Sequence, residues 1–259
     1  MVKVGTHVKA LARSALKTAG FEIINLKHNE RYGWDWVRDI SRLAPLYARR
    51  IETIFDVGAN AGQTALELRQ QFPDAELHCF EPTPATFKLL SERVGDLQRM
   101  HIYPVALGAS AGTATLRCFP GTLINTLATD APFMQRFPDV VASTVGSVEV
   151  PVRTIDDVCR EQRIERISLL KIDTEGYDLD VLNGARGMLQ AGKVDIVVTE
   201  ITHAAPASVP ERGNLVSAID LLHTYGFQLI STYTDGIAKS LPLYLLSNAL
   251  FVRAATHDA

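Results

Sequence analysis

The chain of 259 residues has few cysteines, no long apolar run and little net charge. Its three cysteines, Cys79, Cys118 and Cys159, show no C-x-x-C spacing and cannot all pair, which indicates a reducing compartment. No apolar run approaches the roughly 18 residues that a membrane-spanning helix needs. The formal net charge of −3 creates no overall field that would attract nucleic acid. These shortages predict a cytoplasmic protein with no nucleic-acid partner.

The first 20 residues contain no acidic residue. Basic side chains are interspersed there with valine and leucine, a pattern typical of a basic amphipathic helix, and the continuous apolar core of a secretory signal is missing. Such a helix either packs as a cap on a domain, the commoner arrangement, or makes weak peripheral contact with anionic lipid. We expect residues 1–50 to form a helical appendage and residues 51–259 to form the main domain.

A glycine turn between an apolar run and a helical pattern organises the main domain. Residues 53–62 begin as an apolar, β-branched run typical of a buried strand and end in a turn that holds Gly58 and Gly62. Residues 63–72 then repeat apolar side chains at helical spacing. The glycines are spaced Gly-x-x-x-Gly and not Gly-x-Gly-x-x-Gly. By itself this turn fits either a nucleotide-like ligand or a tight connection in any α/β protein.

An acidic residue follows at an informative distance. Glu81 lies 19 residues after Gly62 and directly after a second apolar run, residues 75–80. A carboxylate about 20 residues past the glycine turn, at the end of the next strand, binds a ribose diol in doubly wound folds. Such a carboxylate can accept hydrogen bonds from both hydroxyls at once.

Five short blocks along the chain resemble the FkbM family of S-adenosylmethionine-dependent O-methyltransferases. They occur in the same order, across roughly residues 51 to 231. Together they are far more specific than any one block. The blocks are Asp56–Gly62, Phe80–Pro82, Ala106–Gly108, Val150–Val152 with Thr154–Asp156, and Leu170–Gly176.

This resemblance implies a fold, a cofactor and a reaction. The fold is α/β: a Rossmann-like, doubly wound, mostly parallel sheet of the class I methyltransferase type, with an N-terminal helical appendage and a β insertion. The reaction is transfer of a methyl group from S-adenosylmethionine to a hydroxyl group of a sugar, in a glycan or a glycosylated natural product. The residues expected to bind the cofactor are Gly58, Asn60, Gly62, Glu81, Pro82 and Ala106, with Asp56 at its methionine end.

Carboxylates also follow the other strand-like runs. Asp56, Glu81, Asp173 and Glu200 each stand at the carboxyl end of an apolar run, and ligands bind outside those ends in open parallel sheets. An acidic crevice repels phosphate but attracts a sulfonium with an adjacent ammonium. The pattern therefore favours S-adenosylmethionine over a nicotinamide or nucleoside triphosphate cofactor.

Three residues are candidates for the base that removes a proton from the acceptor hydroxyl. Asp173 ends the fourth expected strand; Glu175 either shares its work or caps the following helix; His203 either acts as the base or is a solvated loop histidine. Asp173, Glu200 and His203 could also bind Mg²⁺ together, although no compact ligand motif requires a metal.

The sequence pattern of residues 112–152, two β-like stretches that flank a loop-rich segment, predicts a β insertion. Asn125, Thr126 and Arg136 are its candidate substrate contacts. Trp34 and Trp36 are expected to pack on the sheet, with a sugar pocket as the alternative.

Two other functions remain open: a Rossmann-type NAD(P) oxidoreductase and a non-catalytic carbohydrate-binding protein on the same fold.

Overall fold

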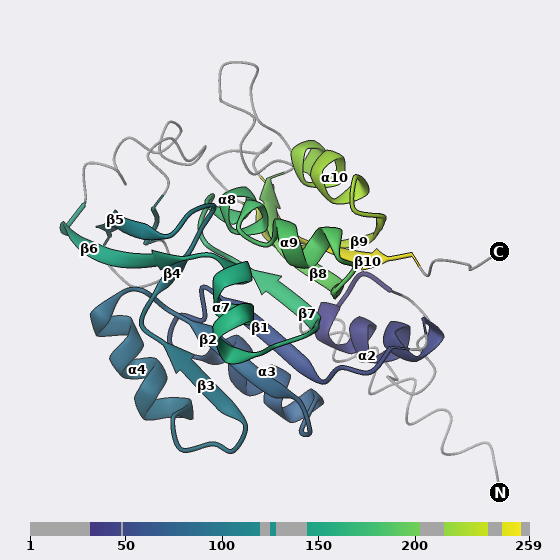
Figure 1. Ribbon diagram of the computed structural model, residues 1–259, viewed down its shortest axis with the longest axis horizontal. Helices are drawn as coiled ribbons and strands as arrows, with labels where there is room; N and C mark the ends of the chain where they lie inside the picture. Colours follow the sequence, from purple (N-terminus) through teal and green to yellow (C-terminus); the bar gives the residue numbers. More distant parts are fainter. Residues whose placement is uncertain are drawn as a thin grey trace, which may run out of the picture. The chain divides into compact units, whose positions relative to one another are not determined.

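The computed structural model describes residues 32–47, 49–119, 125–127, 144–202, 215–237 and 245–254 (Figure 1). The chain divides into one unit over Met1–Tyr32 and another over Gly33–Ala259. The amphipathic segment expected over residues 1–20 lies outside the described residues. Within the described residues, every helix is too short or too polar to cross a membrane.

A seven-stranded sheet forms the centre of the larger unit, in the order β3-β2-β1-β7-β8-β10-β9. The strands from β3 to β8 run parallel, whereas β10 runs antiparallel to both β8 and β9, its neighbours. This confirms the expected doubly wound, mostly parallel sheet. The strands are β1 (Thr53–Val57), β2 (Glu76–Phe80), β3 (Met100–Tyr103), β7 (Ile167–Ile172), β8 (Val194–Thr202), β9 (Phe227–Ile237) and β10 (Leu245–Arg253).

Helices cover both faces of this sheet because its strand residues are apolar on both sides (Figure 1). Ile54 and Leu169 belong to a core cluster with one set of helices, and their neighbours Phe55 and Leu170 belong to a second cluster with the other set. The first set is α2 (Trp36–Leu46), α3 (Gln63–Gln71) and α4 (Pro84–Val94). The second is α7 (Ile155–Gln162), α8 (Asp178–Asn183), α9 (Arg186–Gln190) and α10 (Leu215–His223).

The expected β insertion contributes to a small second sheet, in the order β4-β6-β5. β5 (Gly112–Cys118) and β6 (Gly146–Arg153) pair antiparallel, and β6 also pairs parallel with β4 (Ala106–Leu107). Leu116, Val150 and Val152 bury a core of their own with Ala106. The insertion is thereby attached to the main domain at the chain segment that follows β3.

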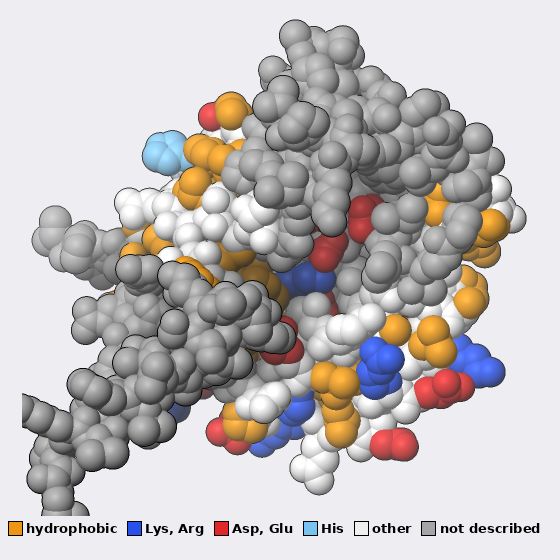
Figure 2. All heavy atoms as spheres, turned by 180° about the vertical axis from the view of Figure 1, so that it is seen from behind, with side chains coloured by type: hydrophobic (Ala, Val, Ile, Leu, Met, Phe, Trp, Pro, Cys, Tyr) orange, Lys and Arg blue, Asp and Glu red, His pale blue; other side chains and the backbone are white. Residues whose placement is uncertain are grey.

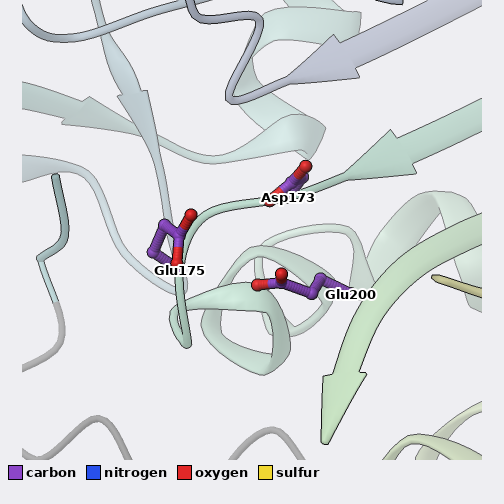
Figure 3. A group of neighbouring side chains, drawn as sticks. All are labelled: Asp173, Glu175 and Glu200. Carbon is purple, nitrogen blue, oxygen red and sulfur yellow. The ribbon is translucent and has the colours of Figure 1, made fainter. Parts of the chain in front are cut away.

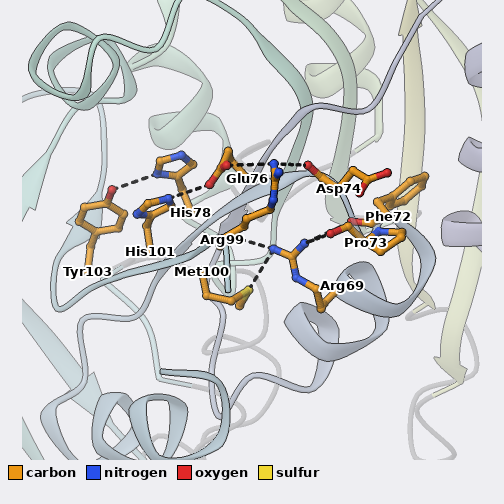
Figure 4. Close-up of polar contacts among 10 residues, drawn as sticks. All are labelled: Arg69, Phe72, Pro73, Asp74, Glu76, His78, Arg99, Met100, His101 and Tyr103. Atoms are coloured by element: carbon orange, nitrogen blue, oxygen red, sulfur yellow. Dashed lines mark hydrogen bonds and ion pairs between the residues drawn. The ribbon is translucent and has the colours of Figure 1, made fainter. Parts of the chain in front are cut away.

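Two details of the fold concern aromatic and polar side chains. Trp36 packs against the core of α2 and α3, as expected, whereas the Trp34 side chain is 56% exposed. At the β2–β3 edge, His78 stacks on His101 and its Nδ1 lies 2.9 Å from the hydroxyl of Tyr103 (Figure 4). Burial lowers the pKa of His78 to about 4, so this ring is neutral and the contact is an ordinary hydrogen bond.

Candidate active site

A cavity of about 410 Å³ opens where β1, β2, β7 and β8 end. Figure 2 shows acidic side chains and a basic side chain at the bottom of a hollow on this face. The turn after β1 forms one wall, and Leu116 and Leu127 of the insertion form another. Among the described residues, the charged ones that line the cavity are Glu81, Lys171, Asp173, Glu175 and Glu200. Ligands of doubly wound sheets bind at this edge.

The glycine turn is shaped by neighbouring protein atoms. A Cβ on Gly58, whose φ is +78°, would lie 1.9 Å from the carbonyl oxygen of Asp173, so no other residue fits there. Gly62 begins α3 with φ of +84°, and a Cβ there would press on Leu90 and Val94 of α4 at 3.0 and 3.2 Å. Gly58 lines the cavity and Gly62 does not. Backbone conformation and neighbouring protein atoms therefore account for both glycines without a ligand.

Glu81 is fixed at the cavity wall by two backbone hydrogen bonds. Its Oε1 accepts a hydrogen bond from the Thr83 N–H at 2.8 Å, and its Oε2 accepts one from the Asn60 N–H at 3.1 Å. Burial raises the pKa of Glu81, and these hydrogen bonds oppose the rise. Each oxygen keeps a lone pair for a ligand hydroxyl. Pro82 and Ala106, predicted beside it, also line the cavity.

Asp56 lies beneath the cavity, which differs from its expected place at the methionine end of the cofactor. The Asp56 side chain is 0% exposed. In the sheet, Asp56 on β1 is the direct cross-strand partner of Lys171 on β7. Asp56 Oδ1 lies 3.2 Å from Lys171 Nζ. The sequence reasoning overlooked Lys171, although a lone lysine inside an otherwise largely apolar strand was a readable signal.

Three carboxyl groups meet on the far side of the cavity (Figure 3). Asp173 follows β7, Glu175 lies in the next loop and Glu200 lies on β8; one oxygen of each lies within 4.8 Å of the others. Burial, together with the nearby Asp173 and Asp178 carboxylates, raises the pKa of Glu175 to about 8. Burial and the same neighbours also raise the pKa of Glu200. Glu175 therefore retains a proton at neutral pH.

The loop between β7 and α8 is fixed by buried polar contacts. Asp178, in the first turn of α8, lies near the Thr174 and Thr199 hydroxyls, at 3.1 and 3.2 Å, and is another residue that sequence reasoning missed. Burial raises its pKa to about 6. Glu175 has φ of +54°, a left-handed conformation that is uncommon for glutamate. Its side chain lies with the cluster.

The insertion contributes described residues to the site. Asn125 lines the cavity and accepts a hydrogen bond from the Phe119 N–H at 3.0 Å. The Thr126 hydroxyl donates to the Glu175 carbonyl at 2.8 Å. Two other predicted residues, His203 and Arg136, lie outside the described residues.

The strand order, with β10 inserted antiparallel between β8 and β9 and an acidic cavity at the strand ends, is that of class I S-adenosylmethionine-dependent methyltransferases. The chain belongs to the family described as the methyltransferase FkbM domain, which matches residues 56–229. This confirms the resemblance read from the five sequence blocks.

Several known proteins are similar to the chain. Methyltransferase sdnD of Sordaria araneosa is 33% identical over 51% of this chain and 59% of its own length. 2-O-methyltransferase NoeI of Sinorhizobium fredii is 28% identical over 71% of this chain and 75% of its own length. Hexuronic acid methyltransferase AglP of Haloferax volcanii is 27% identical over 63% of this chain and 62% of its own length. A more distant likeness is to the solved methyltransferase domain of METTL16, with 12% identity, a TM-score of 0.48, and coverage of 95% of this chain and 79% of that one.

The family defines the cofactor as S-adenosylmethionine, and the cavity fits it. Beside the Gly58–Asn60 turn, the buried Glu81 carboxyl group would accept hydrogen bonds from the ribose hydroxyls. The carboxyl oxygens of Asp173, Glu175 and Glu200 offer acceptors for the cationic methionine end. The turn after β1 lacks the Gly-x-Gly-x-x-Gly spacing of dinucleotide sites, which argues against the NAD(P) oxidoreductase alternative.

A divalent cation is a separate question. Asp173, Glu175 and Glu200 together offer the oxygen ligands that Mg²⁺ prefers. However, the Lys171 ammonium lies 3.5 Å from Asp173 Oδ2, and a positive charge so close opposes binding of a second cation. The site therefore shows no clear preference for a metal.

Proposed function

We propose that the chain transfers a methyl group from S-adenosylmethionine to a hydroxyl oxygen of a sugar, in a glycan or a glycosylated natural product. The observation that carries this proposal is the cluster of Asp173, Glu175 and Glu200 in the same cavity as the predicted ribose ligand Glu81. Two relatives bear names that specify 2-O-methyl transfer and a hexuronic acid substrate. Both names are consistent with a carbohydrate hydroxyl as acceptor.

The cofactor would be held by the walls formed at β1 and β2. We assign its ribose to Glu81 and its adenine to the surface near Pro82 and Ala106, with the turn at Gly58 and Asn60 beside it. When bound, S-adenosylmethionine supplies an electrophilic methyl group on its sulfonium. The chain must hold the acceptor oxygen close to this group and in line with it, and exclude water.

We assign the general base to Asp173. An alcohol must lose its proton around the transition state, and a positioned carboxylate accelerates this step by about 10²–10⁴-fold. Lys171 Nζ lies beside Asp173, whereas Glu175 and Glu200 have pKa values raised by burial. Asp173 is thus the carboxyl group best suited to accept a proton. Glu175 and Glu200 are suited to hydrogen-bond neighbouring acceptor hydroxyls.

The test is a transfer assay with S-adenosylmethionine and a panel of free and aglycone-linked sugars, with mass detection of the added methyl group. We expect transfer to at least one hydroxylated acceptor. We expect Asp173→Asn to lower kcat by about 10²–10⁴-fold while the Kd for S-adenosylhomocysteine changes less than about threefold. Binding of the cofactor without transfer to any acceptor would favour the non-catalytic alternative.

Contact of residues 1–20 with membranes is a separate proposal, supported by their basic composition alone. Co-sedimentation with vesicles that contain phosphatidylserine tests it. Binding that vanishes in a variant lacking residues 1–20 and in high salt would support it.

A further inference from the structure

A buried lysine lies at the floor of the cavity. All six residues of β7 are buried, and the Lys171 side chain is only 4% exposed. Among the described residues that line the cavity, Lys171 is the one basic residue. Its position there is defined by strand register, because Lys171 is the direct cross-strand partner of Asp56 on β1.

Lys171 joins two carboxylates of different exposure. Its Nζ lies 3.2 Å from Oδ1 of the wholly buried Asp56 and 3.5 Å from Oδ2 of Asp173, whose side chain is 36% exposed. Residues two apart on an extended chain point the same way, so the side chain of Asp173, directly after β7, lies on the same side as that of Lys171. The buried carboxylate thus holds the lysine from below, and the lysine contacts the carboxylate that faces the cavity.

The lysine is charged despite its burial. Burial alone would lower the pKa of Lys171, but Asp56 and Asp173 outweigh this effect and raise the pKa above its ordinary value. An isolated buried ammonium is strongly unfavourable, so the arrangement is stable only as a set of paired charges. Neither oxygen of the Asp56 carboxylate has a hydrogen-bond partner of good geometry among the described residues, so the ion pair with Lys171 Nζ at 3.2 Å is the main contact of that carboxylate.

We propose that Lys171, anchored by Asp56, is a positioning residue that holds the Asp173 carboxylate turned toward the acceptor in the cavity. This inference rests on the proposed function. Lys171 acts through Asp173 and does not itself contact the reacting atoms. Removing the ammonium would leave Asp173 able to rotate away, and a misplacement of about 1 Å can cost about 10²-fold in rate.

The experiment compares the double variant Asp56→Asn/Lys171→Met with the wild-type enzyme. Lys171→Met alone would leave Asp56 as an unpaired buried carboxylate, which by itself destabilises the fold, whereas the double variant removes both charges together. We expect the double variant to keep a Tm near the wild-type value and a Kd for S-adenosylhomocysteine within about threefold, but to lose about 10²-fold in kcat. Lys88→Met, at an exposed site on α4, is the matched control and should retain wild-type kcat.

Crystal structures of the wild-type and double-variant complexes with S-adenosylhomocysteine provide a readout that does not need an acceptor. We expect the Asp173 carboxylate to have turned or lost its single position in the variant. An unchanged Asp173 carboxylate would overturn the proposal, as would recovery of wild-type kcat in the double variant. A rise in Kd that matches the loss in rate would instead make Lys171 a cofactor ligand and also overturn it.

These outcomes separate this inference from the proposed function. If the wild-type enzyme methylates no hydroxylated acceptor, the proposed function fails, whereas the orientation of Asp173 still decides the role of Lys171. If the wild-type enzyme transfers methyl groups and Asp173 does not move in the double variant, only the role of Lys171 is wrong.

Discussion

At the scale of single residues, Glu81 and Glu76 lie at opposite ends of one strand region but in different surroundings. Glu81 is 6% exposed and accepts two backbone N–H groups at the cavity. Glu76 is 42% exposed and pairs with Arg99 and His101 at the sheet edge (Figure 4). Glutamate is therefore the proposed ribose ligand at one end of β2 and a surface ion-pair partner at the other.

We predict that Glu81→Gln weakens cofactor binding. The substitution replaces a charged acceptor for the ribose hydroxyls by a neutral amide with a single acceptor oxygen, and the weaker hydrogen bonding costs about 1.5–3 kcal/mol, or about 10- to 100-fold in Kd. Isothermal titration with S-adenosylhomocysteine measures this change. Glu76→Gln, on the same strand, is the control and should bind as the wild type does; equal weakening in both variants would contradict the assignment of Glu81.

Glu175 gives a residue-scale prediction about pH. Its pKa rises from 4.5 to about 8 on folding, so between these values the folded protein retains a proton that the unfolded chain has released. This group makes the free energy of unfolding fall as pH rises from about 4.5 to 8. Below a pH of about 4.5 Glu175 does not affect stability, because it is protonated in both states. Above its folded-state pKa of about 8, its full destabilising effect is present.

We therefore expect Glu175→Gln to lose less stability between pH 5 and pH 8 than the wild type, by about 1 kcal/mol or more. Urea denaturation at the two pH values measures the difference. Glu149→Gln, at an exposed position, is the control. A variant whose stability falls with pH as steeply as that of the wild type would show that Glu175 does not carry this effect.

At the scale of elements, the turn between β1 and α3 is fixed by the end of β7. The Gly58 Cα lies so close to the Asp173 carbonyl that a Cβ would be 1.9 Å from its oxygen. The cofactor wall and the proposed base are thus parts of one packed unit. A shift in the turn would also displace Asp173.

We predict that Gly58→Ala destabilises the protein by more than about 2 kcal/mol, because the left-handed conformation alone costs roughly 1–2 kcal/mol and the contact adds to it. Denaturant unfolding followed by circular dichroism measures the change. Gly146→Ala, where an added Cβ meets nothing within 4 Å, should stay within about 0.5 kcal/mol of the wild type. Equal effects in both variants would show that the close approach to Asp173 is not what requires glycine at position 58.

At the scale of the whole molecule, cofactor choice should be visible as stabilisation. A ligand at 100 times its Kd stabilises the folded state by about 2.7 kcal/mol, which is about 5–10 °C in Tm for a chain of this size. We expect S-adenosylhomocysteine to produce such a shift in differential scanning fluorimetry and NAD to produce none. A shift with NAD alone would support the oxidoreductase alternative.

Much of the fold could be predicted because local patterns carry it. The apolar runs that became β1, β2, β7 and β8 and the spacing of Glu81 after the glycine turn are properties of neighbouring residues. The candidate site was harder to predict. Asp56 looks like another strand-end carboxylate in the sequence, and only the register of β1 against β7 places it beneath the cavity opposite Lys171.

The sequence by itself determined the family, the parallel sheet and the set of acidic residues at its edge, because periodicity, spacing and short motifs are read along the chain. The tertiary structure decided which of these residues meet. It set Lys171 between Asp56 and Asp173, joined Glu200 to Asp173 and Glu175, and raised pKa values by burial. Such effects depend on distances between strands and on exclusion of water, which arise only when segments far apart in the sequence pack together.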